Sequence, residues 1–203
     1  METNLALGHR GRPREFCVEA ALAAALRVFW SKGYEGASLT ELTEAMGISR
    51  PSLYAAFGNK EDLFRKALDL YEQEKLAYVG AALKAPTARG VAERLLHGAL
   101  EMQTGGADPK GCLGVISTVA CGSEAESIKA EVLARQASAD RALLQRIEQA
   151  KAEGDLPESI EPAGLFRHLK AVLQGLCVQA GAGASPTDLR LLVDTTLELW
   201  PGR

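Results

Sequence analysis

Apolar residues recur every three to four positions along most of the chain, the spacing that marks one face of an α-helix. Glycine and proline interrupt this pattern at Gly33, Pro86, Gly154 and Pro157. The pattern predicts about nine helices, at residues 15–32, 38–46, 50–57, 60–83, 88–103, 112–121, 123–153, 161–180 and 186–200. The segment 112–121 is apolar nearly all round and would also suit a strand, but its helical context favours a helix. We therefore expect an all-α fold.

Two short helices joined by a tight turn form the most informative stretch. Ser38 and Glu41 have the spacing of a capping box, in which each side chain accepts a hydrogen bond from a backbone N–H. Gly47 tolerates the left-handed conformation that ends a helix. Ser49 can then cap the second helix, with Pro51 in its first turn. A short helix that is fixed at its base and polar at its N-terminal end is typical of a recognition helix, so the stretch predicts a helix-turn-helix.

The charge of the chain indicates nucleic-acid binding only in one local segment. The net charge of −3 over 203 residues gives no general affinity for nucleic acid. Residues 1–13 contain little that could pack and predict a flexible arm, in and just after which lie Arg10, Arg12 and Arg14. Arginines in an extended segment can enter a minor groove, where the negative potential is enhanced. A solvated tail is the alternative, but the position just before a helix-turn-helix favours a DNA contact.

Composition bounds the class of protein. A hydrophobic content of 47% is ample for a buried core in one domain or two small ones. No apolar run approaches the roughly 20 residues of a membrane span, and no signal peptide is recognisable, so we expect a cytoplasmic protein with no membrane partner. No nucleophile–base set, phosphate loop or cofactor motif is present. We therefore expect neither an enzyme nor a bound cofactor or metal.

The four cysteines are dispersed, without the paired spacing of a zinc site. Cys112 and Cys121 lie two and a half turns apart on one predicted helix and cannot bond to each other while it is intact. Cys112 is the better candidate for a thiol that senses an oxidant or electrophile, because a helix N-terminus stabilises thiolate. An inert, buried cysteine is the alternative.

From residue 12 to about residue 71 the sequence resembles the TetR family of bacterial transcriptional regulators. The residues that carry the resemblance are Phe29, Gly33, Tyr34, Ser38, Leu39, Ala45, Gly47, Ser49, Leu53, Tyr54, Phe57, Lys60 and Leu63. The resemblance implies a three-helix DNA-binding head at residues 14–59 and a ligand-binding and dimerisation domain at 60–203, with helix 60–83 as the connector. It also implies a homodimer held by the last two helices.

The resemblance places the DNA contacts at the helix starts of the motif. Thr40, Tyr54 and Lys60 would bind phosphate, while Ser49, Arg50, Pro51 and Ser52 would face base edges. Arg50 is the only long donor there and is the candidate for reading a guanine; a phosphate contact is the alternative. The dimer residues that follow from the apolar stripes of the last two helices are Leu165, Leu169, Val172, Leu176, Leu189, Val193, Thr196 and Trp200.

Together these features predict a homodimeric repressor of a palindromic double-stranded DNA operator, released by a small apolar or amphipathic effector of unknown identity. Residues expected to line the effector site are His97, Gln103, Cys112, Ile116, Val119 and Gln174. The alternatives are a regulator that senses redox state or electrophiles through Cys112, and a helical protein-interaction module without DNA binding. The arginine-rich arm beside a capped helix pair favours DNA binding over the interaction module.

Overall fold

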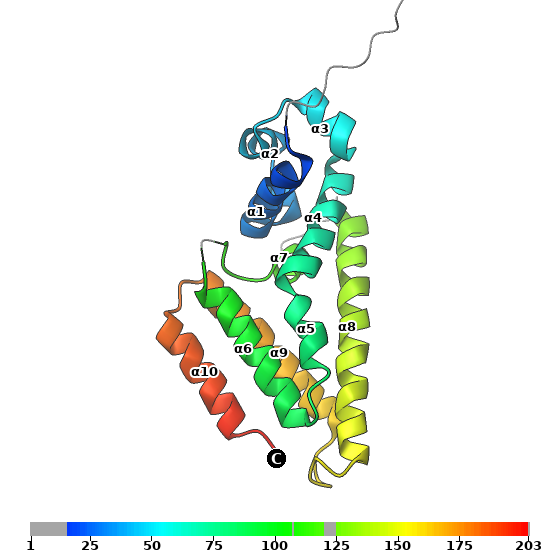
Figure 1. The fold of residues 1–203 in the computed structure, drawn as a ribbon, viewed down its shortest axis with the longest axis vertical. Helices are drawn as coiled ribbons and strands as arrows, with labels where there is room; N and C mark the ends of the chain where they lie inside the picture. Colours follow the sequence, from blue (N-terminus) through cyan, green and yellow to red (C-terminus); the bar gives the residue numbers. More distant parts are fainter. Residues whose placement is uncertain (1–15, 107, 120–124, 203) are drawn as a thin grey trace, which may run out of the picture.

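The computed structural model describes residues 16–106, 108–119 and 125–202, and this part of the chain is helical without strands. A head at one end is followed by a larger helical body (Figure 1). The helices are α1 (Val18–Gly36), α2 (Leu39–Met46), α3 (Arg50–Phe57), α4 (Lys60–Lys75), α5 (Ala77–Ala82), α6 (Ala88–Thr104), α7 (Leu113–Val119), α8 (Glu126–Ala152), α9 (Pro162–Gly181) and α10 (Pro186–Glu198). The all-α prediction is confirmed.

The predicted boundaries hold within a few residues, with one difference in number. The single helix expected at 60–83 is two helices, because Leu76 leaves helical geometry at φ −105° and ψ 8°. This turn redirects the next residues, and the Tyr78 ring lies directly over Gly98 of α6, where a Cβ would be 2.3 Å from it. The described residues therefore form ten helices rather than nine.

The first helix also differs from its prediction. It starts at Val18 and reaches Gly36, but it is broken at Gly33, which has φ 72° and ψ 177°. The prediction that Gly33 ends the regular helix is therefore confirmed. A Cβ added at Gly33 would lie 3.2 Å from Cγ2 of Ile116 in α7, so a close approach as well as a positive φ favours glycine at this position.

The head has one core, to which α1, α2, α3 and α4 contribute. Phe29 is fully buried and meets Phe64 of α4 edge to face, with ring centroids 5.1 Å apart. Leu53 and Phe57 anchor α3 to this core. Because α4 shares the head's core and continues toward the body, a shift of α4 must move the head with it.

The short helix α7 belongs with the head. It covers Leu113–Val119 rather than 112–121, and Cys121 lies outside the described residues. Leu113 is fully buried in the same core as the head helices, together with Ile128 and Val132 of α8. The prediction of a helix here is thus confirmed, and this helix is buried against the head.

The body is a second core made by α6, α9, α10 and the end of α8, with α8 running alongside α4 and α5 (Figure 1). Ion pairs join α8 to α4: Arg135 reaches Asp69 at 2.6 Å and Glu72 at 3.1 Å, and Arg65 reaches Glu131 at 2.8 Å. Such exposed pairs contribute little singly, but as a network they fix the angle between the two helices. No helix in the described ranges is long and apolar enough to cross a membrane.

Candidate DNA-binding surface and effector cavity

The N-terminal end of α3 is built as the sequence predicts. The Ser49 hydroxyl accepts a hydrogen bond from the backbone N–H of Ser52 at 3.3 Å, and the two hydroxyls are 2.9 Å apart. Pro51 occupies the first turn. Gly47 adopts φ 66° and ψ 30° and ends α2 sharply, which sets the turn between the two helices. Arg50, Pro51 and the half-exposed Tyr54 point away from the core.

Arg50 and Thr40 come together on this surface. Arg50 Nη2 donates a hydrogen bond to the Thr40 hydroxyl at 2.7 Å, although the two residues are on different helices. Both side chains are exposed. The bond links the two helices of the motif at the surface and holds the guanidinium beside the start of α2.

Lys60 lies at the start of α4, where its ammonium sits 4.6 Å from the centre of the Tyr34 ring. Burial lowers the pKa of Lys60, and the nearby Glu35 carboxylate opposes this shift. An ammonium placed over an aromatic face is held in one position. The lysine predicted to bind phosphate is therefore oriented by the head itself.

The start of α2 is stabilised by a complete capping box. The Glu41 carboxylate accepts from the backbone N–H of Ser38 at 3.1 Å, and the Ser38 hydroxyl accepts from the N–H of Glu41 at 3.2 Å. Lys32 of α1 pairs with the same carboxylate. The Lys32 ammonium, with the Ser38 donors, lowers the pKa of Glu41 to about 2. Arg10, Arg12 and Arg14 of the predicted arm lie outside the described residues.

A cavity of about 180 Å³ opens between α5, α6, α8 and α9, and its lining is mainly apolar. A larger pocket of about 560 Å³ shares four of its lining residues, Leu76, Val79, Cys112 and Ala139. The ion pair between Lys170 and Asp140 supplies the charged groups of the first cavity. Such a site suits a small apolar molecule with one polar group.

Two of the six residues expected at the effector site, Cys112 and Gln174, line this cavity. His97 is on the exposed face of α6, with Nδ1 3.0 Å from the carbonyl of Glu93. Ile116 packs against Gly33 at the head instead. The side chain of Val119 lies outside the described residues.

Gln103 is buried, but it serves the backbone rather than a ligand. Its amide oxygen accepts from the N–H of Gly111 at 2.7 Å, and its amide nitrogen donates to the Gly111 carbonyl at 3.0 Å. The indole N–H of Trp30 donates to the same carbonyl at 3.0 Å. The placement of Gln103 in the effector lining is therefore corrected: both ends of its amide are used to fix residue 111.

Residues 108–112, hereafter the junction loop, connect the head with the body. The Asp108 carboxylate pairs with Arg27 of α1 at 2.6 Å and with Lys75 of α4 at 2.8 Å. These cations, Lys75 first, lower the pKa of Asp108 against the opposing effect of its partial burial. The loop thus touches the head on one side and the cavity, through Cys112, on the other.

Sequence reasoning missed Cys177 and Tyr71 as neighbours of Cys112. The Tyr71 hydroxyl donates to Cys112 Sγ at 3.6 Å, and Cys177 of α9 lines the same cavity as Cys112. Cys177 falls in the apolar stripe of α9, so its position in the sequence is that of an ordinary core residue. Only the packing of the junction loop on α9 brings the two thiols together.

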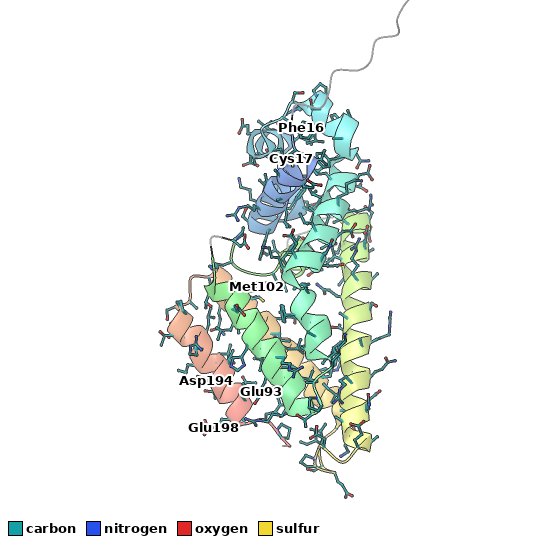
Figure 2. All side chains as sticks on the ribbon, in the orientation of Figure 1. Phe16, Cys17, Glu93, Met102, Asp194 and Glu198 are labelled. Carbon is teal, nitrogen blue, oxygen red and sulfur yellow. The ribbon has the colours of Figure 1, made fainter. Side chains whose placement is uncertain are left out.

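The residues predicted for the dimer interface also need correction. Seven of the eight are buried within the subunit's own core, and Val172 is partly buried there. The apolar stripes of α9 and α10 therefore face inward. Val178, 57% exposed, and Leu191, 65% exposed, lie on the outward side. Asp194 and Glu198 of α10 are also exposed (Figure 2).

Comparison with known proteins places these features in a family. Residues 21–67 match the family model described as bacterial regulatory proteins, tetR family. The chain is 34% identical to the HTH-type transcriptional repressor ComR of Escherichia coli over 194 residues, which cover 95% of this chain and 92% of ComR. The HTH-type transcriptional repressor BdcR of the same organism is 49% identical over 61 residues, 30% of this chain and 31% of BdcR.

A solved structure has the same fold over nearly the whole chain. A cysteine mutant of the TetR family transcriptional regulator CifR, complexed with a 26-base-pair operator DNA, superposes with a TM-score of 0.86 at 39% identity, covering 94% of this chain and 100% of that one. The matched family model spans the helix-turn-helix whose caps and exposed end are described above. The chain therefore belongs to the TetR family of bacterial transcriptional regulators, with its DNA-binding helix-turn-helix in α2 and α3.

Proposed function

We propose that the protein is a homodimeric repressor that binds a palindromic operator and is released by a small effector in the cavity beside the junction loop. The exposed end of α3 carries this proposal, because it presents Arg50, Pro51 and Tyr54 away from the core while Leu53 and Phe57 hold the helix from behind. The repressor ComR and the operator-bound CifR, both similar over nearly the whole chain, support it.

On DNA, each residue of this surface has a distinct task. Arg50 turns from Thr40 to a guanine edge in the major groove, and the freed Thr40 hydroxyl binds phosphate. Tyr54 and Lys60 add phosphate contacts on the flanks, and Ser49 and Ser52 meet the bases beside Arg50. Phosphate contacts fix the register, and Arg50 supplies the sequence preference. The arm with Arg10, Arg12 and Arg14 adds minor-groove contacts.

Dimerisation uses the outward faces of α9 and α10. Val178 and Leu191 are large apolar side chains left open to solvent, and Ala171 is exposed about two turns before Val178 on the same face of α9. Pairing these faces with their copies would bury them and set the separation of the two heads. Two recognition helices must lie roughly 34–36 Å apart to enter successive major grooves of one operator.

Release follows from where the cavity lies. Its lining includes Leu76, at the break between α4 and α5, and Cys112, in the junction loop. An effector can bind more tightly to a conformation in which these two residues are displaced. Such an effector would shift the head away from its DNA-bound position. Its effect on operator affinity equals its difference in affinity for the two states. An apolar molecule with a polar group that meets the Lys170–Asp140 pair fits the lining best.

The direct test is binding of the purified protein to the DNA upstream of its own gene, followed by fluorescence anisotropy and footprinting. We expect a protected palindrome, a stoichiometry of one dimer per site, and an affinity that falls steeply with salt. A shallow salt dependence without a protected site would contradict the proposal. Apolar metabolites are then screened for release, with a Leu76→Trp variant, whose ring fills the cavity, as the matched comparison.

A second candidate effector is a reactive electrophile that alkylates Cys112. This thiol lines both pockets and receives a hydrogen bond from Tyr71. Release of operator DNA by an alkylating agent from the wild type, but not from Cys112→Ser, would favour this mode. Equal release from both proteins would leave the reversible effector as the signal.

A further inference from the structure

Cys112 and Cys177 come from different parts of the chain and line one cavity. Cys112 lies in the junction loop and is half-buried, whereas Cys177 lies on α9 and is 8% exposed. A Cβ added at Gly111, the residue before Cys112, would lie 3.8 Å from the carbonyl oxygen of Cys177. The backbone of the junction loop therefore rests on α9 at the level of Cys177.

The surroundings of the two thiols are unequal. A hydrogen bond from the Cys177 thiol, helped by the backbone N–H of Val115 and the Tyr71 hydroxyl, lowers the pKa of Cys112, although burial opposes this. The hydrogen bond to Cys112, burial and the charge on Cys112 raise the pKa of Cys177. Gln103 Nε2 is also 3.6 Å from Cys177 Sγ. Cys112 is thus the more readily ionised of the two thiols, and of the two it alone lines both pockets.

We propose that Cys112 and Cys177 are a redox pair that forms a reversible disulfide when a hydroperoxide enters the cavity, and that this bond changes the position of the DNA-binding head. Formation of the disulfide does not depend on the proposed function. Its effect on the affinity for operator DNA does depend on that function. The proposal adds Cys177 as the resolving thiol, so the oxidised state is a cross-link rather than a modified single cysteine.

The chemistry balances with the hydroperoxide as the oxidant. The Cys112 thiolate attacks the peroxide, forms an S–O bond and breaks the O–O bond, giving a sulfenic acid and, after proton transfer, water or an alcohol. The sulfur of Cys177 then attacks Cys112, the S–S bond forms, and the sulfenic oxygen leaves with the Cys177 proton as water. Two electrons pass from the thiols to the peroxide, and a dithiol reductant returns them.

The proposed Cys112–Cys177 disulfide would affect the head through Gly111. Its carbonyl accepts hydrogen bonds from Trp30 of α1 and from Gln103 of α6, both at 3.0 Å. Gln103 also donates to Cys177, so the new S–S bond removes one of its partners and draws Cys112 toward α9. Trp30 packs edge to face on Tyr71, with ring centroids 4.9 Å apart, and Tyr71 contacts Cys112. A shift at Cys112 therefore reaches α1 by two routes.

The experiment uses a Cys17→Ser/Cys121→Ser variant, which keeps only the proposed pair of the four cysteines. Cys17 is exposed at the start of α1, in the head, far from Met102 beside the cavity (Figure 2). After treatment with hydrogen peroxide, non-reducing peptide mapping should recover Cys112 joined to Cys177, with both thiols lost and restored by dithiothreitol. The Cys177→Ser version should instead stop at a sulfenic acid that dimedone traps on Cys112.

The effect of the disulfide on the head is measured first without DNA, by Trp30 fluorescence, and then by operator affinity. In a Trp200→Phe background, Trp30 is the remaining tryptophan of two, and its emission should shift on oxidation and return on reduction. Operator affinity should fall by roughly 5- to 150-fold on oxidation and recover with dithiothreitol. Neither change should occur in Cys177→Ala, whose folding is checked by circular dichroism.

The outcomes separate this inference from the proposed function. Absence of the Cys112–Cys177 peptide after oxidation overturns the redox pair whatever the protein does with DNA. A cross-linked protein with unchanged Trp30 emission overturns the coupling. If the reduced protein binds no operator but forms the cross-link with a shift in Trp30 emission, the proposed repressor function fails and the redox pair stands.

Discussion

The indole N–H of Trp30 donates a hydrogen bond to the backbone carbonyl of Gly111 at 3.0 Å, across 81 positions of sequence. Trp30 is fully buried in the head, and Gly111 lies in the junction loop beside the cavity. This bond joins the head that carries the helix-turn-helix to the loop beside the cavity.

Trp30→Phe should therefore lower the stability of the fold and weaken the coupling between the head and the junction loop. Loss of one buried hydrogen bond, with Gly111 kept by Gln103, should reduce the free energy of unfolding by about 1–3 kcal/mol in urea denaturation. Trp200→Phe is the matched control, because the buried Trp200 Nε1 has no hydrogen-bond partner among the described residues. An equal loss in both variants would mean that ring volume, not the bond to Gly111, sets the effect.

Arg50→Ala should relax the sequence preference of operator binding. If the guanidinium reads a guanine, the variant should lose about 1–3 kcal/mol of discrimination at one base pair, measured by anisotropy on a set of single-substitution operators. Arg141→Ala, at an exposed arginine in the middle of α8, serves as the control and should bind all operators as the wild type does. Uniform weakening on every sequence would assign Arg50 to a phosphate instead.

Leu191→Glu should weaken the proposed dimer while the subunit stays folded. The side chain is 65% exposed in the subunit, so the change should alter its own stability by less than about 0.5 kcal/mol. A charge in a paired apolar face should raise the dimer dissociation constant by at least about tenfold, because 1.4 kcal/mol corresponds to that factor. Light scattering after size exclusion measures it, with Leu133→Glu on α8, 46% exposed, as the control.

The capping box of α2 should resist acid. The folded-state pKa of Glu41, about 2, lies below the ordinary value of 4.5, so its contribution to stability is full above 4.5 and is lost as pH falls through 2. The stability difference between wild type and Glu41→Gln, measured in urea, should therefore be constant from pH 7 to about 5 and shrink below that. A difference that does not change with pH would show that the carboxylate charge has no role in the cap.

Local signals in the sequence were enough to predict the helix-turn-helix. Ser38, Glu41, Gly47 and Ser49 each act on backbone groups within a few residues, so their spacing alone specifies where helices begin and end. The same kind of signal predicted the break at Gly33, and the family resemblance of this stretch is confirmed. Arg50 and Thr40 were each predicted at the DNA surface, but not as partners of one hydrogen bond.

Apolar periodicity identifies a buried face without saying what covers it. The apolar stripes of α9 and α10 predict a dimer surface, yet Leu169, Leu176 and Val193 pack inside the subunit. A core and an interface bury the same kinds of side chain, so their patterns are equivalent in one sequence. Only the path of the chain shows that the inward faces are filled and that Val178 and Leu191 remain outside.

By itself, then, the sequence determined the all-helical fold, the capped head and its exposed recognition helix, because these depend on interactions between near neighbours. The tertiary structure alone decided that α7 packs on the head, that Gln103 holds Gly111, and that Cys112 meets Cys177. Those contacts join residues far apart in the chain, and their geometry exists only once the two cores have formed around the junction loop.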